Sequence, residues 1–276
     1  MTCLRTVFFV AALAVPALAQ AQAIAVPPDS TDPDQRVDAL QPDFNLAALP
    51  TTLRMPVHKV AFRVTHRFTR ALGDGDFGDL ASDLFGFDSG AQIGLELRYG
   101  LAPGTQVGVH RTSDRTIQIF GQHSLLTERS GTPVGLDAIA TLEGGNNLRT
   151  RYRSALGLLV SRKAGRLAAL YAEPILVVNS SPMANAGSDN NTLMLGLGGR
   201  LRVRPATYLV AEITPRLAGF DPGVGQISFG LEGRAGGHLF QLNFSNGFGT
   251  TLGQIADGAF NNDHWYIGFN IGRKFF

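Results

Sequence analysis

The sequence predicts an all-β protein, a transmembrane antiparallel up-and-down β-barrel of about twelve strands. Three observations predict it: segments of alternating polarity recur along the chain, the connections between them alternate between short and long, and an apolar export segment precedes them. Successive side chains of a strand point to opposite faces of a sheet. A period of two therefore indicates strands with one apolar face and one polar face.

The clearest alternation lies in residues 57–101, which we interpret as one long hairpin. Apolar side chains fall mostly at even positions in 60–69 and at odd positions in 91–99. Each arm has close to the ~9–11 residues that a tilted strand needs to cross a bilayer. The opposite faces carry full charges, as expected for side chains that face a wet interior.

Further alternating segments predict the remaining strands. They cover residues 106–111, 117–125, 134–143, 152–161, 167–178, 193–203, 208–214, 226–234, 238–245 and 265–275. The segment at 106–111 is short. Pro174 is expected to disrupt the ladder of the segment at 167–178, because proline has no N–H to donate. Either feature would change the strand count by one hairpin.

The lengths of the connections support this topology. Short links are expected at 102–104, 128–133, 164–165, 205–207 and 235–237, and longer loops at 71–89, 144–150, 180–191, 218–224 and 247–263; the brief link at 113–115 is an exception. Outer-membrane barrels have short periplasmic turns and longer extracellular loops. A spanning sheet must also close, because unsatisfied backbone groups are costly in hydrocarbon.

The chain before the first strand predicts export. Arg5 precedes an apolar run at 7–18 and small residues at possible cleavage sites, so residues 1–23 are expected to be a signal peptide. Residues 24–56 are rich in Pro and Asp, have no period, and are expected to form a flexible periplasmic arm. Its apolar part, 44–50, would either dock against the barrel or stay free. Residues 57–276 would form the barrel, in the bacterial outer membrane.

Composition excludes several classes of function. The only cysteine, Cys3, lies in the predicted signal peptide, so disulfides and thiolate sites are not expected in the mature chain. The formal net charge is +2, and no basic–aromatic patch indicates nucleic acid. No phosphate loop or zinc spacing indicates a cofactor. Outer-membrane lipid is the expected partner, and small solutes are a further one.

Aromatic residues mark the end of the chain. Trp265 and Phe275 fall near the two ends of the last strand, where aromatic girdles lie in membrane barrels. A strand that ends on a C-terminal aromatic residue resembles the signal that barrel-assembly machinery reads. Here the apolar phase passes through Phe275 rather than Phe276, a small departure from that register.

Three short motifs resemble a known family. They are His66-Arg67-Phe68, the stretch 85–90 leading into a strand that ends at Tyr99-Gly100, and the stretch 108–112. Together they resemble predicted outer-membrane β-barrel proteins known as domain of unknown function 5777, over roughly residues 49–276. The resemblance implies a single-chain bacterial barrel in the outer membrane, and it brings no catalytic residues.

The alternation also predicts which charged residues face the lumen. They are Arg63, Arg67, Glu96, Arg98, Asp137, Glu143, Arg153, Arg200, Arg202, Glu212, Glu232 and Arg234. These side chains would either line a narrow passive channel for small solutes or pair with one another and fill a closed barrel. In the second case the extracellular loops would act as a structural or recognition platform.

Two further sites were considered. Asp74, Asp76 and Asp79 alternate with glycine and other residues as in calcium loops, but the usual continuation to glutamate is missing. The alternatives are a solvated acidic loop or a short helix at 79–85, capped by Asp79, that folds over or into the barrel mouth. An outer-membrane hydrolase would need His110 or His123, but His123 and Ser124 are adjacent and point to opposite faces. We therefore expect no enzyme.

Overall fold

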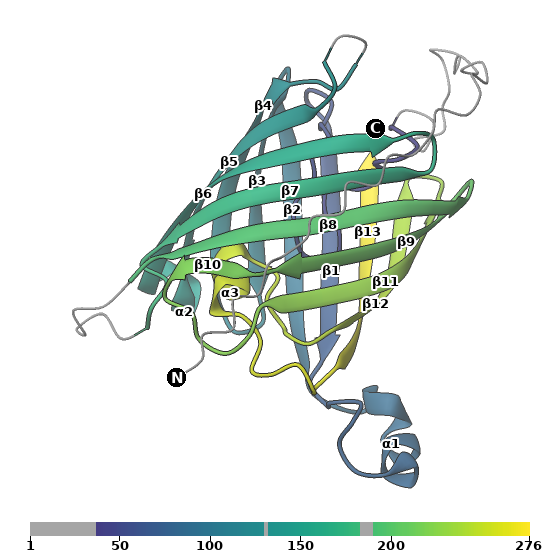
Figure 1. The fold of residues 1–276 in the computed structure, drawn as a ribbon, viewed down its shortest axis with the longest axis vertical. Coiled ribbons are helices and arrows are strands. Elements are labelled where there is room, and N and C mark those ends of the chain that lie inside the picture. Colours follow the sequence, from purple (N-terminus) through teal and green to yellow (C-terminus); the bar gives the residue numbers. More distant parts are fainter. Residues whose placement is uncertain (1–36, 130–131, 183–189) are drawn as a thin grey trace, which may run out of the picture. The chain divides into compact units, whose positions relative to one another are not determined.

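The computed structural model describes residues 37–129, 132–182 and 190–276. The predicted signal peptide and residues 24–36 lie outside the described residues. Within them the chain forms a closed antiparallel barrel (Figure 1), as predicted. No helix of this part of the chain is long and apolar enough to cross a membrane.

Twelve strands make the wall, in agreement with the predicted number. They are β1 (Val60–Phe68), β2 (Ala91–Ala102), β3 (Thr105–Thr112), β4 (Ile117–Leu126), β5 (Gly135–Gly144), β6 (Thr150–Ala164), β7 (Ala168–Val178), β8 (Thr192–Arg204), β9 (Thr207–Thr214), β11 (Gln226–Ala235), β12 (His238–Ser245) and β13 (Tyr266–Phe275). A short strand β10 (Arg216–Gly219) prolongs β9 beyond Pro215 and pairs with β8. Each wall strand pairs with its neighbours along the chain, and β1 pairs with β13 to close the sheet.

The short helices lie in the connections at one end of the barrel. They are α1 (Phe77–Ser82), the 3-10 turn η2 (Leu84–Gly86), α2 (Gly145–Leu148) and α3 (Leu252–Asp257). The opposite end has the short turns and the C-terminus (Figure 1). Because short turns face the periplasm in outer-membrane barrels, we call this the periplasmic end and the other the extracellular end.

The outer face of the wall is largely apolar between its two rims. On β2, for example, Leu95 and Leu97 are about half exposed, whereas Glu96 and Arg98 between them are buried in the lumen. In β1 the inward residues are Ala61, Arg63, Thr65 and Arg67. The alternation that the sequence predicts therefore sorts the side chains between lipid and lumen.

Pro174 lies within β7 without ending it. The pairing of β7 with β6 skips Pro174 and Glu173 and resumes in the same register, with Gly157 opposite Ile175 and Val160 opposite Ala172. On the other side Pro174 pairs with Leu195 of β8. The predicted disruption is thus local, and the number of strands is unchanged.

Residues 38–55 lie inside the barrel, and we call this segment the plug. Nearly all of its residues are buried, including Leu46, Leu49 and Phe44. The prediction of a flexible periplasmic arm is therefore wrong for these residues, while the alternative of docking at 44–50 is the one observed. The arm was misjudged because its burial depends on wall side chains that are distant in sequence.

Candidate functional site in the barrel lumen

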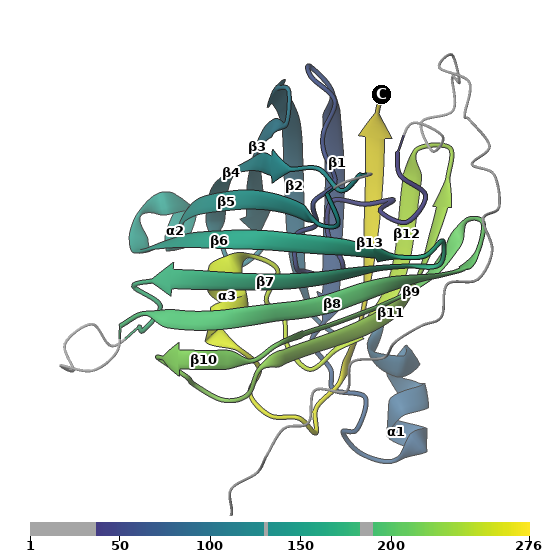
Figure 2. The same ribbon diagram turned by 45° about the horizontal axis from the view of Figure 1, so that its top comes forward.

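The plug enters and leaves the lumen through the periplasmic end (Figure 2). On its first leg, the Tyr208 hydroxyl donates to the Ala39 carbonyl and Lys274 Nζ donates to the Pro42 carbonyl, both at 2.8 Å. On its second leg, Gln106 at the start of β3 bonds the backbone of Leu53 and Met55, both at 3.1 Å. These partners lie at the periplasmic ends of their strands. The segment is therefore a U-shaped insertion that could be withdrawn without threading a chain end through the barrel.

The tip of the plug turns back between Asn45 and Pro50. The Leu46 N–H donates to the Leu49 carbonyl at 2.8 Å, and Asn45 and Pro50 form a β-bridge. One wall residue binds the N–H groups of this turn. The Glu212 carboxylate accepts hydrogen bonds from the backbone N–H groups of Ala47, Ala48 and Leu49, each at 3.0 Å.

Cationic and amide side chains hold the carbonyl groups of the same turn. Arg63 Nη2 donates to the Ala47 carbonyl at 2.8 Å and to the Leu46 carbonyl at 3.2 Å. Asn270 Nδ2 and Arg67 Nη2 also donate to the Ala47 carbonyl, at 3.0 and 3.3 Å. The polar backbone of the plug, which would be costly to bury unpaired, is thus satisfied by wall side chains.

The inner wall of β5 to β9 carries a cluster of apolar side chains among its buried charged and polar ones. A single buried cluster joins wall residues such as Ile139, Leu159 and Ile175 to Leu46 and Leu49 of the plug. Leu252, Ile255 and Ala256 of α3 belong to the same cluster. The plug and α3 pack against this cluster and fill the space beside it, which agrees with the alternative of a filled barrel.

The structure places the predicted lumen residues on the inner face, ten of the twelve fully buried. These ten are Arg63, Arg67, Glu96, Arg98, Asp137, Glu143, Arg153, Arg200, Glu212 and Glu232. Arg202 and Arg234 lie at the periplasmic rim, where both donate to the Pro205 carbonyl and remain partly exposed.

Several of these residues pair within the wall. Arg200 Nε lies 2.8 Å from Glu232 Oε1, and both side chains are fully buried. Arg98 Nη2 lies 3.0 Å from Glu96 Oε1, and its guanidinium also stacks between Phe44 of the plug and Phe120. The lumen therefore combines charge pairs within the wall, as the closed-barrel alternative expects, with charged side chains that bind the plug.

The loop between β12 and β13 closes the extracellular half of the lumen. Its helix α3 is capped by Thr251, whose side chain accepts from the Gln254 N–H in a capping box. The Gly253 N–H donates to Glu143 at 3.1 Å, and Arg153 donates to the Gly253 carbonyl and Asp257, both at 2.8 Å. These contacts hold α3 against β5 and β6.

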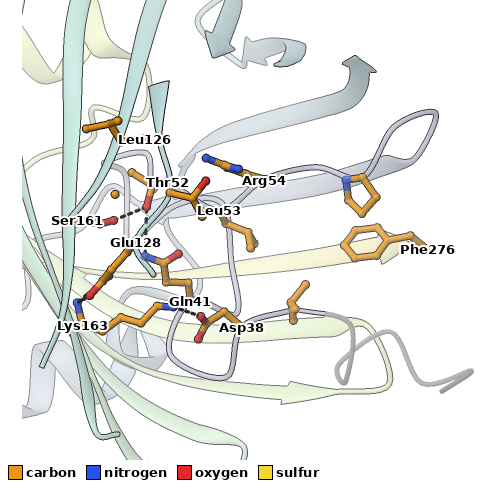
Figure 3. A pocket seen from close by; sticks show the side chains of 14 residues that line it. Asp38, Gln41, Thr52, Leu53, Arg54, Leu126, Glu128, Ser161, Lys163 and Phe276 are labelled. Atoms are coloured by element: carbon orange, nitrogen blue, oxygen red, sulfur yellow. Dashed lines mark hydrogen bonds and ion pairs between the residues drawn. The ribbon is translucent and has the colours of Figure 1, made fainter. Parts of the chain in front are cut away.

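A cavity of about 240 Å³ opens at the periplasmic end between the two legs of the plug (Figure 3). Lys163 of β6 forms an ion pair with Asp38 on one leg, and Ser161 shares a 2.6 Å hydrogen bond with Thr52 on the other. The C-terminal Phe276 also lines this cavity. By contrast, the cavity beside the plug near Asp43 and Arg63 has a volume of only about 10 Å³, room for roughly one water molecule.

The acidic loop between β1 and β2 contains α1. Asp76 caps the helix by accepting from Gly78 and Asp79, and the Asp79 side chain accepts from the Asp76 N–H. The helix predicted at 79–85 with Asp79 as its cap is therefore shifted by a few residues, and none of its residues is buried. It does not enter the mouth, which α3 occupies instead. Among residues 37–129, 132–182 and 190–276, no three acidic, His or Cys residues are grouped to hold a metal ion.

The two histidines considered for hydrolysis lie on opposite faces of the wall. His110 points inward, with Nδ1 3.9 Å from Glu96 Oε2, whereas the ring of His123 bonds Thr105 at 2.8 Å. Ser124 is bonded to Arg54 instead. The described hydrogen bonds pair neither histidine with a serine.

Docking of residues 44–50 was one of two alternatives from the sequence, but three wall residues that hold the plug were not predicted. Gln241, Asn270 and Lys274 fall in the inward phase of their strands, so the same alternation could have found them. The predicted lumen residues are all charged and end at Arg234, so they include neither the two amides nor Lys274. The capping box Thr251-Leu252-Gly253-Gln254 was a sequence signal for α3.

Comparisons with known proteins agree with this architecture. The family model described as membrane bound beta barrel domain, DUF5777, matches residues 43–275. A search of curated proteins found no match. Among solved structures, the NanC porin is 8% identical, with a TM-score of 0.51 over 79% of this chain and 99% of that chain, which shows a shared fold.

Two other outer-membrane proteins are similar at lower scores. An outer membrane channel from Pseudomonas putida F1 is 13% identical over 80% of this chain and 97% of its own, with a TM-score of 0.49. Omp33 of Acinetobacter baumannii is 13% identical over 79% of this chain and 98% of its own, with a TM-score of 0.46. This chain is a β-barrel of the bacterial outer membrane, and it belongs to the DUF5777 family of membrane bound β-barrel domains.

Proposed function

We propose that the protein is a narrow channel for small solutes, closed by its plug and opened when the plug withdraws toward the periplasm. The observation that carries the proposal is the way the plug is held. Its tip is fixed by polar side chains of the wall, chiefly Glu212, Arg63 and Arg67, which are the residue types that line water-filled lumens.

The U shape of the plug makes withdrawal feasible. Both legs reach the same mouth, and after Pro56 the chain joins β1 beside the end of β2, where the His58 N–H donates to the Gly100 carbonyl. Withdrawal would expose the polar side of the lumen along β13, β1 and β2. Because α3 is held by Glu143 and Arg153 on β5 and β6, a solute path would pass along the side opposite to it.

A change in the plug alone tests this proposal without altering the wall. Ala48→Pro removes the N–H that donates to both oxygens of Glu212. A hydrogen bond to a charged group contributes about 1.5–3 kcal/mol, so the open probability in planar bilayers should rise about tenfold or more. Migration of the unheated protein on gels would show that the barrel is still folded.

Two outcomes would count against the proposal. Silence from both intact and Ala48→Pro protein, with folding established, would mean that the barrel is not a channel. Equal open probabilities from both would mean that the plug is not what closes it.

A second function, recognition through the extracellular loops, is favoured by one observation. Phe77 is 75% exposed, and Phe85 and Phe87 in the same loop are also exposed beside five aspartates. Exposed aromatic residues of this kind are enriched in binding surfaces. Phe77→Ser with Phe85→Ser should then abolish binding of a surface partner to intact cells while leaving conductance unchanged.

A further inference from the structure

Ala47 of the plug is held through both of its main-chain groups by the wall. Its N–H donates to Glu212 Oε2 at 3.0 Å. Its carbonyl oxygen accepts from Arg63 at 2.8 Å, Asn270 at 3.0 Å and Arg67 at 3.3 Å. All four wall side chains are buried, so this one residue has a complete polar environment on the lumen wall.

The charges of this environment exceed those of the group it holds. Two guanidinium groups meet a neutral carbonyl oxygen, and a carboxylate meets three neutral N–H groups. Asp43, also in the plug, is 3.9 Å from Arg63 Nε, too long for a hydrogen bond. Hydrogen bonds with one ionised partner are already stronger than neutral ones, and a ligand with the opposite charges would add the attraction between full charges, so it would bind this wall more strongly than Ala47 does.

The spacing of the two half-sites is that of one amino acid. The nitrogen and the carbonyl group of Ala47 are separated by its Cα alone, as are the ammonium and carboxylate of a free α-amino acid. An ammonium group has three N–H donors. It would replace the N–H groups of Ala47, Ala48 and Leu49 at Glu212, and a carboxylate would replace the Ala47 carbonyl at the arginines.

We propose that Glu212, Arg63, Arg67 and Asn270 form a binding site for a zwitterionic α-amino acid, which the plug occupies with Ala47 when the barrel is closed. This inference rests on the proposed channel function and names its substrate class. The ligand and the plug compete for the same groups. Binding of the amino acid therefore favours the open state, because a ligand shifts an equilibrium toward the state that it binds better.

Space for a ligand side chain lies next to the site. An added Cβ on Gly198 would lie 2.4 Å from Leu46 Cδ1, and one on Gly196 would lie 3.0 Å from both methyl groups of Leu49. The wall at these glycines thus makes room for the two leucines of the plug. Withdrawal of the plug would leave an apolar hollow there, suited to an apolar amino-acid side chain.

Uptake into proteoliposomes that contain the full chain tests the site. The labelled probes are L-alanine, L-alaninamide without the carboxylate, N-acetyl-L-alanine without the ammonium, and the neutral polyol erythritol. We expect saturable uptake of L-alanine well above that of the other three. Equilibrium dialysis of L-alanine against the purified protein gives a second readout that does not require conduction.

Variants with matched controls separate binding from support of the fold. Glu212→Gln and Arg67→Gln each remove one charge from the site, so the ratio of alanine to erythritol uptake should fall about tenfold or more. Because both changes also loosen the plug, a purely structural role would raise the uptake of both solutes equally and leave the ratio unchanged. Glu128→Gln and Arg151→Gln, outside the site, should keep the wild-type ratio.

The outcomes distinguish this inference from the channel proposal. If the barrel conducts salt but the alanine-to-erythritol ratio is the same in wild type and Glu212→Gln, the amino-acid site is wrong and the channel stands. If bilayers stay silent but dialysis shows alanine binding that Glu212→Gln abolishes, the site is supported and the channel is rejected. No binding and no conduction overturn both.

Discussion

Arg200 on β8 and Glu232 on β11 form an ion pair that passes over the inner face of β9, the strand between them. The Arg200 guanidinium meets both carboxylate oxygens, at 2.8 and 2.9 Å, and also donates to the Asn45 carbonyl of the plug at 2.8 Å. The pair therefore links two wall strands, across the strand between them, and the plug at one point. Neither side chain is exposed to solvent.

Breaking this pair on one side should be costly. Glu232→Gln leaves the Arg200 guanidinium buried without its ion-pair partner, and such a loss typically costs about 3–5 kcal/mol. We expect a correspondingly lower stability in urea unfolding of the folded protein in detergent. Replacing both residues by Met should recover much of the loss; an equally unstable double variant would show that the pair is more than charge compensation.

The lipid-facing position of the outer residues can be tested by comparing the cost of a charge at two depths in the membrane. Leu97, near the middle of β2, and Leu167, at the periplasmic rim before β7, are both about half exposed or more. Leu97→Arg should destabilise the barrel by about 2–4 kcal/mol in lipid, and Leu167→Arg by about 0–1 kcal/mol. Unfolding free energies in phospholipid vesicles provide the comparison. Equal costs at the two positions would contradict the assigned membrane span.

Much of this fold could be predicted from the sequence because lipid and lumen impose opposite polarities on alternate residues. For this reason the predicted bounds of β3, β4 and β12 agree with the structure to within a residue or two. Inward charges such as Arg63 and Glu212 were found by the same rule. The alternation reports which face a residue occupies, however, and not what it touches there.

The plug could not be predicted in this way because it has no period. Its backbone is held by residues far away in sequence, such as Glu212 for Ala47, and a single sequence does not show such pairings. The apolar residues from Phe44 to Leu49, in an arm otherwise rich in Pro and Asp, were the one available signal. The apolar inner face around Ile175 and Met194 was a second, since a wet lumen would not favour it.

Asp114, in the extracellular turn between β3 and β4, should make stability depend on pH. Burial opposes ionisation of its carboxyl, but hydrogen bonds from Thr112 and Thr116 outweigh this and hold its pKa below the usual range. A lowered pKa gives a stabilisation that is complete above about pH 4, the ordinary range of an aspartate, and is lost as the pH falls through the lowered value.

The variant Asp114→Asn tests this linkage. At pH 7 it should unfold at a lower temperature than the wild type, because the ionised carboxylate also accepts from Gln254 of α3. The difference should shrink as the pH is lowered below 4. A difference that is constant from pH 7 to pH 3 would show that ionisation of Asp114 does not contribute.

Closure of the lumen by the plug is the central claim, and a reversible cross-link tests it most directly. Leu49→Cys with Gly196→Cys places one thiol on the plug and one on β8, where an added Cβ already lies 3.0 Å from the Leu49 methyl groups. The only native cysteine, Cys3, lies in the predicted signal peptide. The two single variants are the controls for each substitution.

The measurement is single-channel current in planar bilayers from the oxidised double variant, before and after a reductant is added. We expect no current steps from the cross-linked protein, and discrete steps once the disulfide is reduced, while the single variants do not respond to the reductant. Current from fully cross-linked protein equal to that of the reduced protein would contradict the account, because solutes would then cross the barrel with the plug in place.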